Sequence, residues 1–109
     1  MSILEPVDGQ SVVERQYVSG KTTDSSAEVW VIIHPMEVSD YWVQPRTSVR
    51  DDGTWKVSAY VGRPGGIDVG RLFEIRAVAN PKQDLREGQV LSYWPEAQWK
   101  SKVIEVKRK

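Results

Sequence analysis

A chain of 109 residues without cysteine is long enough for one hydrophobic core, and its stability does not depend on disulfide bonds. Fifteen lysines and arginines balance fifteen aspartates and glutamates, which disfavours a broad phosphate-binding surface. No apolar run approaches the roughly 18 residues of a membrane span. We expect a single domain over residues 1–109, cytoplasmic if Met1 is the natural start and extracytoplasmic if the domain is excised from a longer chain.

The first third of the chain predicts short strands separated by turn residues. Residues 3–6 predict an edge strand that ends at a proline, and residues 11–19 predict a second strand closed by Gly20. Residues 29–33 (Val-Trp-Val-Ile-Ile) are apolar on both faces and rich in β-branched side chains. That pattern favours a central strand over a helix of the same length.

The clearest hairpin lies near the middle of the chain. A short aromatic strand over residues 41–44 and a strand over residues 47–50 precede the turn dipeptide Asp52-Gly53. In the following strand, residues 55–61, every second side chain is apolar. This alternation predicts that one face of the strand is buried and the other is solvated.

The last third predicts three more strands, over residues 72–79, 90–94 and 102–107. Between the first two of these, Asn80-Pro81 is suited to cap and begin one helical turn, with Gly88 as its end. The basic end of the chain is expected to be a solvated last strand and a frayed terminus; its cations are Lys100, Lys102, Lys107, Arg108 and Lys109.

Together these elements predict an all-β fold, an antiparallel β-sandwich of about seven short strands. At most one short helical turn is expected, near residues 81–87. A five-stranded barrel of the OB type is the main alternative, but the number and spacing of the strands favour the sandwich.

Four segments of the chain resemble bacterial immunoglobulin-like and fibronectin-III-like domains. They are residues 3–9 together with 17–20, residues 29–35 with Trp30, residues 52–55, and residues 73–79. The chain lacks the paired cysteines of antibody domains and has no tyrosine at the corner position of the strand that contains Phe73. The resemblance implies a non-catalytic accessory or adhesion module, and it transfers no functional residue.

The aromatic residues divide into two groups. Trp30, Trp55 and Phe73 lie in strand patterns and are expected in the core. Four others flank prolines and polar loops, and they are the candidate binding residues: Tyr41, Trp42, Trp94 and Trp99. The alternative for Trp94 and Trp99 is that they anchor a long connection over the open end of the core.

Residues with catalytic or metal-binding chemistry are sparse. His34 is the only histidine, and a general base needs an orienting carboxylate and a nearby nucleophile. Calcium could be held only if Asp51, Asp52 and Asp68 met at one end of the molecule, whereas turn formation already accounts for Asp52. Residues 62–66 lack the Lys-Ser/Thr that follows a phosphate loop. We expect no enzyme activity, no cofactor and no metal.

These patterns predict a non-catalytic interaction or spacer module whose partner is another protein or domain. One alternative is a carbohydrate-binding sandwich that uses the exposed aromatic side chains. Another is an OB-like binder of single-stranded nucleic acid, which the neutral net charge disfavours.

Overall fold

The chain folds into eleven strands and no helix, and a computed structural model describes all 109 residues. The strands are β1 (Ser2–Glu5), β2 (Ser11–Val12), β3 (Arg15–Lys21), β4 (Val29–Pro35), β5 (Tyr41–Val43), β6 (Ser48–Val49), β7 (Thr54–Tyr60), β8 (Leu72–Pro81), β9 (Val90–Leu91), β10 (Ala97–Lys100) and β11 (Ile104–Arg108).

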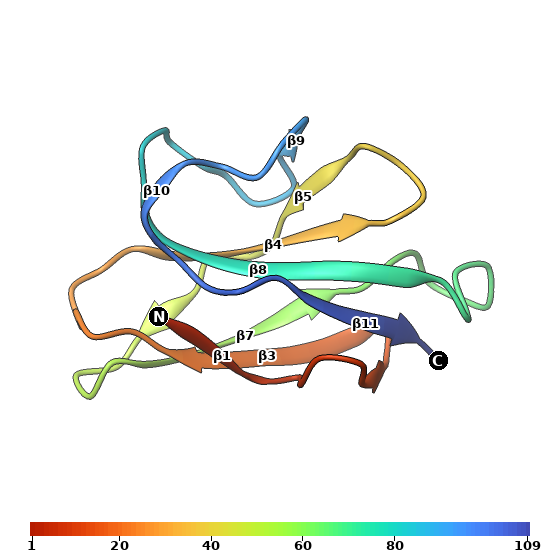
Figure 1. Ribbon diagram of the computed structural model, residues 1–109, viewed down its shortest axis with the longest axis horizontal. Helices are drawn as coiled ribbons and strands as arrows, with labels where there is room; N and C mark the ends of the chain where they lie inside the picture. Colours follow the sequence, from red (N-terminus) through yellow and green to blue (C-terminus); the bar gives the residue numbers. More distant parts are fainter.

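The strands form two sheets that face each other as a β-sandwich (Figure 1). The smaller sheet has four strands in the order β1-β3-β7-β6. The larger sheet has the order β2-β11-β8-β4-β5-β9, and β10 also pairs with β8. All pairs are antiparallel except β2 with β11. The β6–β7 hairpin turns at Gly53, whose φ of 84° suits glycine, while Asp52 accepts the backbone N–H of Thr54 at 3.0 Å.

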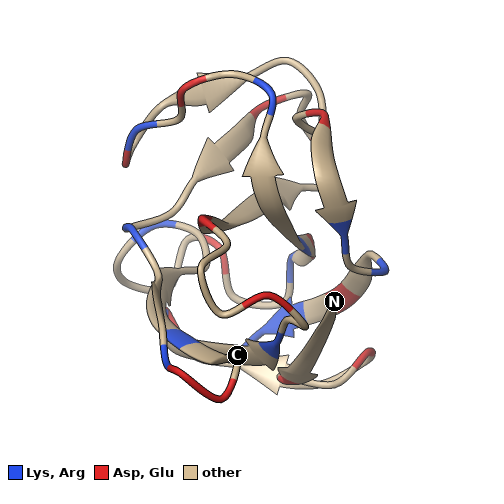
Figure 2. Cartoon of the chain, turned by 90° about the vertical axis from the view of Figure 1, so that its left-hand side faces the viewer, with Lys and Arg blue, Asp and Glu red and all other residues tan.

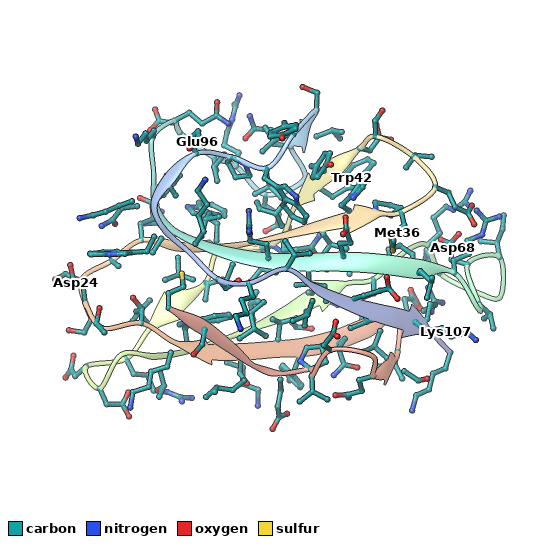
Figure 3. All side chains as sticks on the ribbon, viewed as in Figure 1. Asp24, Met36, Trp42, Asp68, Glu96 and Lys107 are labelled. Carbon is teal, nitrogen blue, oxygen red and sulfur yellow. The ribbon has the colours of Figure 1, made fainter.

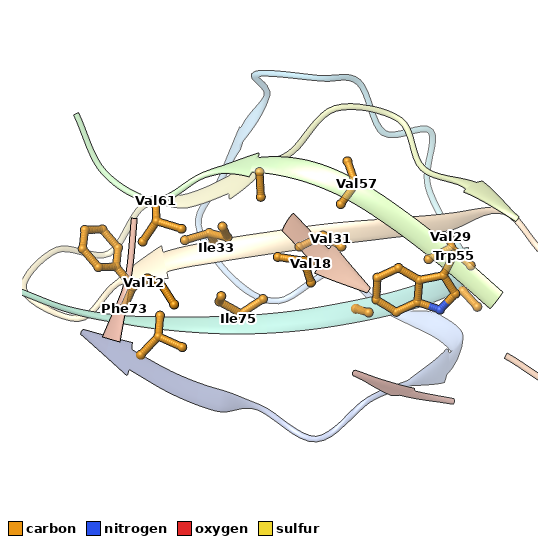
Figure 4. Close-up of a cluster of buried hydrophobic side chains, with 14 of the residues drawn as sticks. Val12, Val18, Val29, Val31, Ile33, Trp55, Val57, Val61, Phe73 and Ile75 are labelled. Atoms are coloured by element: carbon orange, nitrogen blue, oxygen red, sulfur yellow. The ribbon is translucent and has the colours of Figure 1, made fainter. Parts of the chain in front are cut away.

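The main core lies between the two sheets (Figure 4). Strand alternation builds it: Val29, Val31 and Ile33 of β4 face the smaller sheet, and Trp55 and its alternate neighbours on β7 face back. Figure 4 shows Phe73 and Trp55 toward opposite ends of this cluster. Its other members include Val12, Val18, Ile75 and Val106.

A second cluster covers the outer face of the larger sheet. The connection from β8 to β10, which includes β9, folds over this face and contributes Leu85. Leu85 packs with Trp30, Ile32 and Val78, all buried. Strand β4 is therefore covered on both faces, in agreement with its apolar sequence. Trp30 is buried at 4% exposure, but it lies on this outer face and not between the sheets.

The predicted number of about seven strands was too low: the predicted strand over residues 11–19 is divided into β2 and β3, and β10 was not predicted. Residues 11–19 contribute to both sheets: β2 pairs with β11, and β3 pairs with β1 and β7. One edge of β8 pairs with β4. Along its other edge, residues 72–75 pair with β11 and residues 78–81 pair with β10. Between them, the Ser101 hydroxyl accepts the Ala77 N–H at 2.9 Å and interrupts the regular ladder.

No helical turn forms after Asn80, because the chain there continues as part of a strand. Pro81 is the last residue of β8, and the N–H of Lys82 donates to the carbonyl of Glu96 at 2.9 Å. The Asn80 side chain accepts the Glu28 N–H at 2.9 Å instead of capping a helix. The OB-type barrel was also a wrong alternative, since the strands separate into two sheets and do not close into a barrel.

The basic terminus is only partly solvated. Lys107 and Lys109 are exposed, but Arg108 is buried at 3% exposure, so the expectation of a frayed end was wrong for this residue. Its guanidinium donates to the backbone carbonyls of Val61, Arg63 and Gly65 at 2.8–2.9 Å. Elsewhere both signs of charge are interspersed along the chain (Figure 2).

Candidate functional site

A groove of about 540 Å³ opens at the flank where β5 meets the loops that follow β4 and β7. Trp42 pairs with Ile33 in the register of β4 and β5, so both side chains are on the same face of the larger sheet. Ile33 is covered by the smaller sheet, which ends at the two-residue strand β6. Trp42 is 41% exposed and borders the groove.

Gln44 closes the inner wall of the groove by connecting the two sheets. Its side-chain oxygen accepts the backbone N–H of Tyr60 at 2.7 Å, and the backbone N–H of Gln44 donates to the Val31 carbonyl at 3.0 Å. Gln44 is 4% exposed, so both contacts are shielded from water. The apolar part of the lining includes Ile33, Val38, Trp42, Val43, Leu72 and Phe73.

Asp68 holds two arginines at the β8 end of the groove. Its carboxylate accepts the Arg63 N–H at 2.7 Å and the Arg63 guanidinium at 2.9 Å, and the Arg71 Nε lies 3.6 Å away. Arg71 also forms an ion pair with Glu37. The Arg63 side chain, and then its backbone N–H, lower the pKa of Asp68 to about 2.

Two carboxylates of the groove have no such partner. Asp40 and Glu87 line the groove, are exposed, and form no hydrogen bond or ion pair with another side chain. The N–H of Gly88 donates to the Val43 carbonyl at 2.9 Å, which fixes the backbone beside Glu87 against the end of β5. Figure 3 places Trp42 and Asp68 in the half of the molecule away from Asp24.

The opposite face of β5 carries an aromatic cluster. The His34 and Tyr41 rings stack with centroids 4.1 Å apart, and Trp94 meets Tyr41 edge-on at 4.9 Å. His34 Nδ1 lies 2.8 Å from a carboxylate oxygen of Glu74, and Nε2 lies 2.6 Å from the Val38 carbonyl. Both ring nitrogens are therefore occupied by contacts within the chain.

The four candidate binding residues do not form one platform. Tyr41 and Trp94 lie together, while Trp42 points to the other side of β5 because adjacent strand residues alternate. Trp99 lies on β10 and packs against the main core. Trp94 does not cover the open end of the core, as the alternative prediction had it. It packs against the second cluster on the outer face of the larger sheet.

A second, shallower groove of about 440 Å³ was missed by the sequence analysis. It is lined by Lys82, Gln83, Leu91, Ser92, Tyr93, Trp94, Pro95 and Glu96. Tyr93 is 71% exposed, and its ring lies 6.3 Å from that of Tyr41. Its place beside Trp94-Pro95 in a long polar connection was the signal available in the sequence.

The acidic residues considered for calcium lie apart. Asp51 and Asp52 precede β7, whereas Asp68 follows it in the groove. No three side chains of histidine, cysteine, aspartate or glutamate gather in a group that could hold a metal ion. The structure also contains no helix that is long and apolar enough to span a membrane.

Comparisons with known proteins give no family for the chain. No family model matches it, and neither a curated protein nor a solved structure matches it.

Proposed function

We propose that this chain is a non-catalytic interaction module of the immunoglobulin-like or fibronectin-III-like type, and that it binds a segment of another protein. The strand order supports the fold assignment. Immunoglobulin domains have one sheet in the order A-B-E-D and a second with strands G, F and C. The orders β1-β3-β7-β6 and β11-β8-β4-β5 follow the same pattern.

The groove beside Trp42 carries the functional proposal. Protein interfaces place an aromatic anchor in a water-excluding apolar surface that is surrounded by a polar rim. Trp42 is the exposed aromatic, Val38 and Leu72 supply the exposed apolar surface, and Asp40 and Arg63 belong to the rim. The volume of the groove, about 540 Å³, suits a few side chains of an inserted segment.

The environments of the titratable groups support a binding role over a catalytic one. His34 uses both ring nitrogens to connect β4 to Glu74 and to the loop at Val38. Asp68 is held by Arg63 and Arg71 with its pKa lowered to about 2, so this carboxylate is a weak base. Neither group is placed as a general base would be.

Selection from a phage-displayed random peptide library tests the proposal. We expect the protein to enrich peptides whose binding is lost in Trp42→Ala and retained in Tyr93→Ala, since Tyr93 lines the other groove. Circular dichroism checks that the alanine variant is folded, and Trp42→Phe serves as the conservative control. Enriched peptides that bind both alanine variants equally well, or no enrichment, would contradict the proposal.

The second groove supports carbohydrate binding as a second candidate function. A sugar ring stacks on an exposed aromatic face while amide and hydroxyl groups bind its hydroxyls. Tyr93 offers such a face, with Gln83 and Ser92 in the same groove. Oligosaccharides should then change tryptophan fluorescence in the wild type and in Trp42→Ala but not in Tyr93→Ala. The absence of any change would reject this function.

A further inference from the structure

The charged groups in the groove beside Trp42 are unequally paired. Both of its arginines already have carboxylate partners: Arg63 pairs with Asp68, and Arg71 with Glu37 and Asp68. The two carboxylates left over, Asp40 and Glu87, have no cationic partner within the chain. The lining contains four acidic and two basic side chains, so the groove favours a positively charged occupant.

The unpaired carboxylates are positioned at the two ends of the strand that carries Trp42. Asp40 directly precedes β5, and the hydrogen bond from Gly88 to Val43 places Glu87 beside the end of β5. Trp42 is the middle residue of this three-residue strand. An indole face between carboxylates attracts a guanidinium or ammonium group through its ring quadrupole and through charge.

We propose that the groove binds an arginine side chain of an extended segment of a partner protein. This inference rests on the proposed function and adds the chemistry of the segment. The guanidinium stacks on Trp42 and reaches Asp40 and Glu87, and its planar fork suits carboxylates better than an ammonium does. Residues next to the arginine are apolar, because Val38 and Leu72 line the groove and are 49% and 39% exposed.

Three short peptides test the inference directly: acetyl-Leu-Arg-Leu-amide, its glutamine analogue and its glutamate analogue. In nuclear magnetic resonance titrations of the ¹⁵N-labelled protein, the arginine peptide should shift the Trp42 indole N–H signal at millimolar concentration. We expect it to bind at least about fivefold more tightly than the glutamine peptide, and more weakly in 0.5 M salt. The glutamate peptide should bind most weakly.

A matched pair of double variants isolates the role of charge. Asp40→Asn with Glu87→Gln should weaken binding of the arginine peptide about fivefold and leave the glutamine peptide unchanged. Glu5→Gln with Asp51→Asn makes the same change in net charge at exposed residues outside the groove and should have little effect. Similar losses in both double variants would indicate a general charge effect and overturn the inference.

The remaining outcomes separate this inference from the proposed function. Equal binding of the arginine and glutamine peptides, with loss of both in Trp42→Ala, would overturn the preference for a cation and keep the groove as a protein-binding site. Absence of any shift at Trp42 would also overturn the inference. The library selection would then decide the proposed function by itself.

Discussion

Gly20 has no room for a side chain, although its backbone lies in a regular strand. A Cβ atom there would overlap the Ser2 carbonyl of β1 and the indole ring of Trp55. The absence of a side chain lets the edge strand β1 approach β3 directly above the largest core residue. Glycine in a strand often marks such a close approach of another backbone.

We therefore expect Gly20→Ala to lower the free energy of unfolding by about 2 kcal/mol, the size of a typical overpacking effect. Urea unfolding followed by circular dichroism measures it. Gly66→Ala is the control, because a Cβ atom at Gly66 meets nothing within 4 Å. Equal stabilities of the two variants would show that β1 moves aside at no cost.

Asp68 makes the free energy of unfolding depend on pH in the acidic range. Its pKa falls from an ordinary value of 3.8 to about 2 in the folded state, because Arg63 donates to it through its side chain and then its backbone. A carboxyl group with a lowered pKa stabilises the fold above its unfolded pKa, and this contribution is lost as the pH falls from about 4 toward 2.

The variant Asp68→Asn should lower the free energy of unfolding by about 2 kcal/mol at pH 7, since it removes charge-assisted hydrogen bonds. The difference from the wild type should shrink between pH 4 and pH 2, where the wild-type carboxyl becomes protonated. Urea unfolding at pH 7, 4, 3 and 2 measures both. A difference that stays constant with pH would exclude this role for Asp68.

The connection between β8 and β10 is stabilised by packing and contains only one short strand. Leu85 of this connection is buried, at 6% exposure, and it covers the outer face of β4 and β8 beside Trp30. Long ordered loops generally need an apolar anchor of this kind.

Leu85→Ala should therefore cost about 2–3 kcal/mol of unfolding free energy through lost burial and the cavity left behind. Leu4→Ala makes the same chemical change at a residue that is 56% exposed, and it should cost less than about 0.5 kcal/mol. Thermal and urea unfolding of both variants provide the comparison. Equal costs would mean that the connection is not anchored at Leu85.

The strands with strong alternation were predictable, and their coverage was not. The pattern from Trp55 to Val61 identified the buried face of β7 correctly, and the apolar run of β4 indicated a strand covered on both sides. The sequence did not indicate that a distant loop residue, Leu85, covers Trp30. Periodicity describes one strand at a time, whereas coverage depends on contacts between residues far apart in the chain.

The groove was only partly predictable for the same reason. Exposure of Trp42 follows from its place in a short strand beside a proline, and Asp40 lies on the same side two residues earlier. Tyr41, Trp42, Trp94 and Trp99 do not form one surface, because neighbouring residues in β5 face opposite sides and Trp99 packs against the main core. Asp68 and Arg63 join the groove through a loop whose path the sequence does not specify.

Arg108 connects the end of the chain to the loop that forms one side of the groove. Its side chain donates to the carbonyls of Val61, Arg63 and Gly65, while its Nε has no partner. Its backbone N–H donates to the Arg71 carbonyl at 3.0 Å. One residue thus joins β11, the end of β7 and the start of β8, so that the two sheets and the groove are coupled.

Replacing Arg108 tests whether this connection holds the whole molecule together. Arg108→Ala should lower the free energy of unfolding by about 3 kcal/mol, because buried carbonyls lose charged donors. Arg108→Lys should recover only part of this, since an ammonium cannot reproduce the guanidinium fork. Lys107→Ala, at the exposed neighbour, is the control. Amide hydrogen exchange over residues 62–70 should be faster in Arg108→Ala than in the wild type, and unchanged in Lys107→Ala. Unchanged exchange in Arg108→Ala would show that the end of the chain does not stabilise this side of the groove.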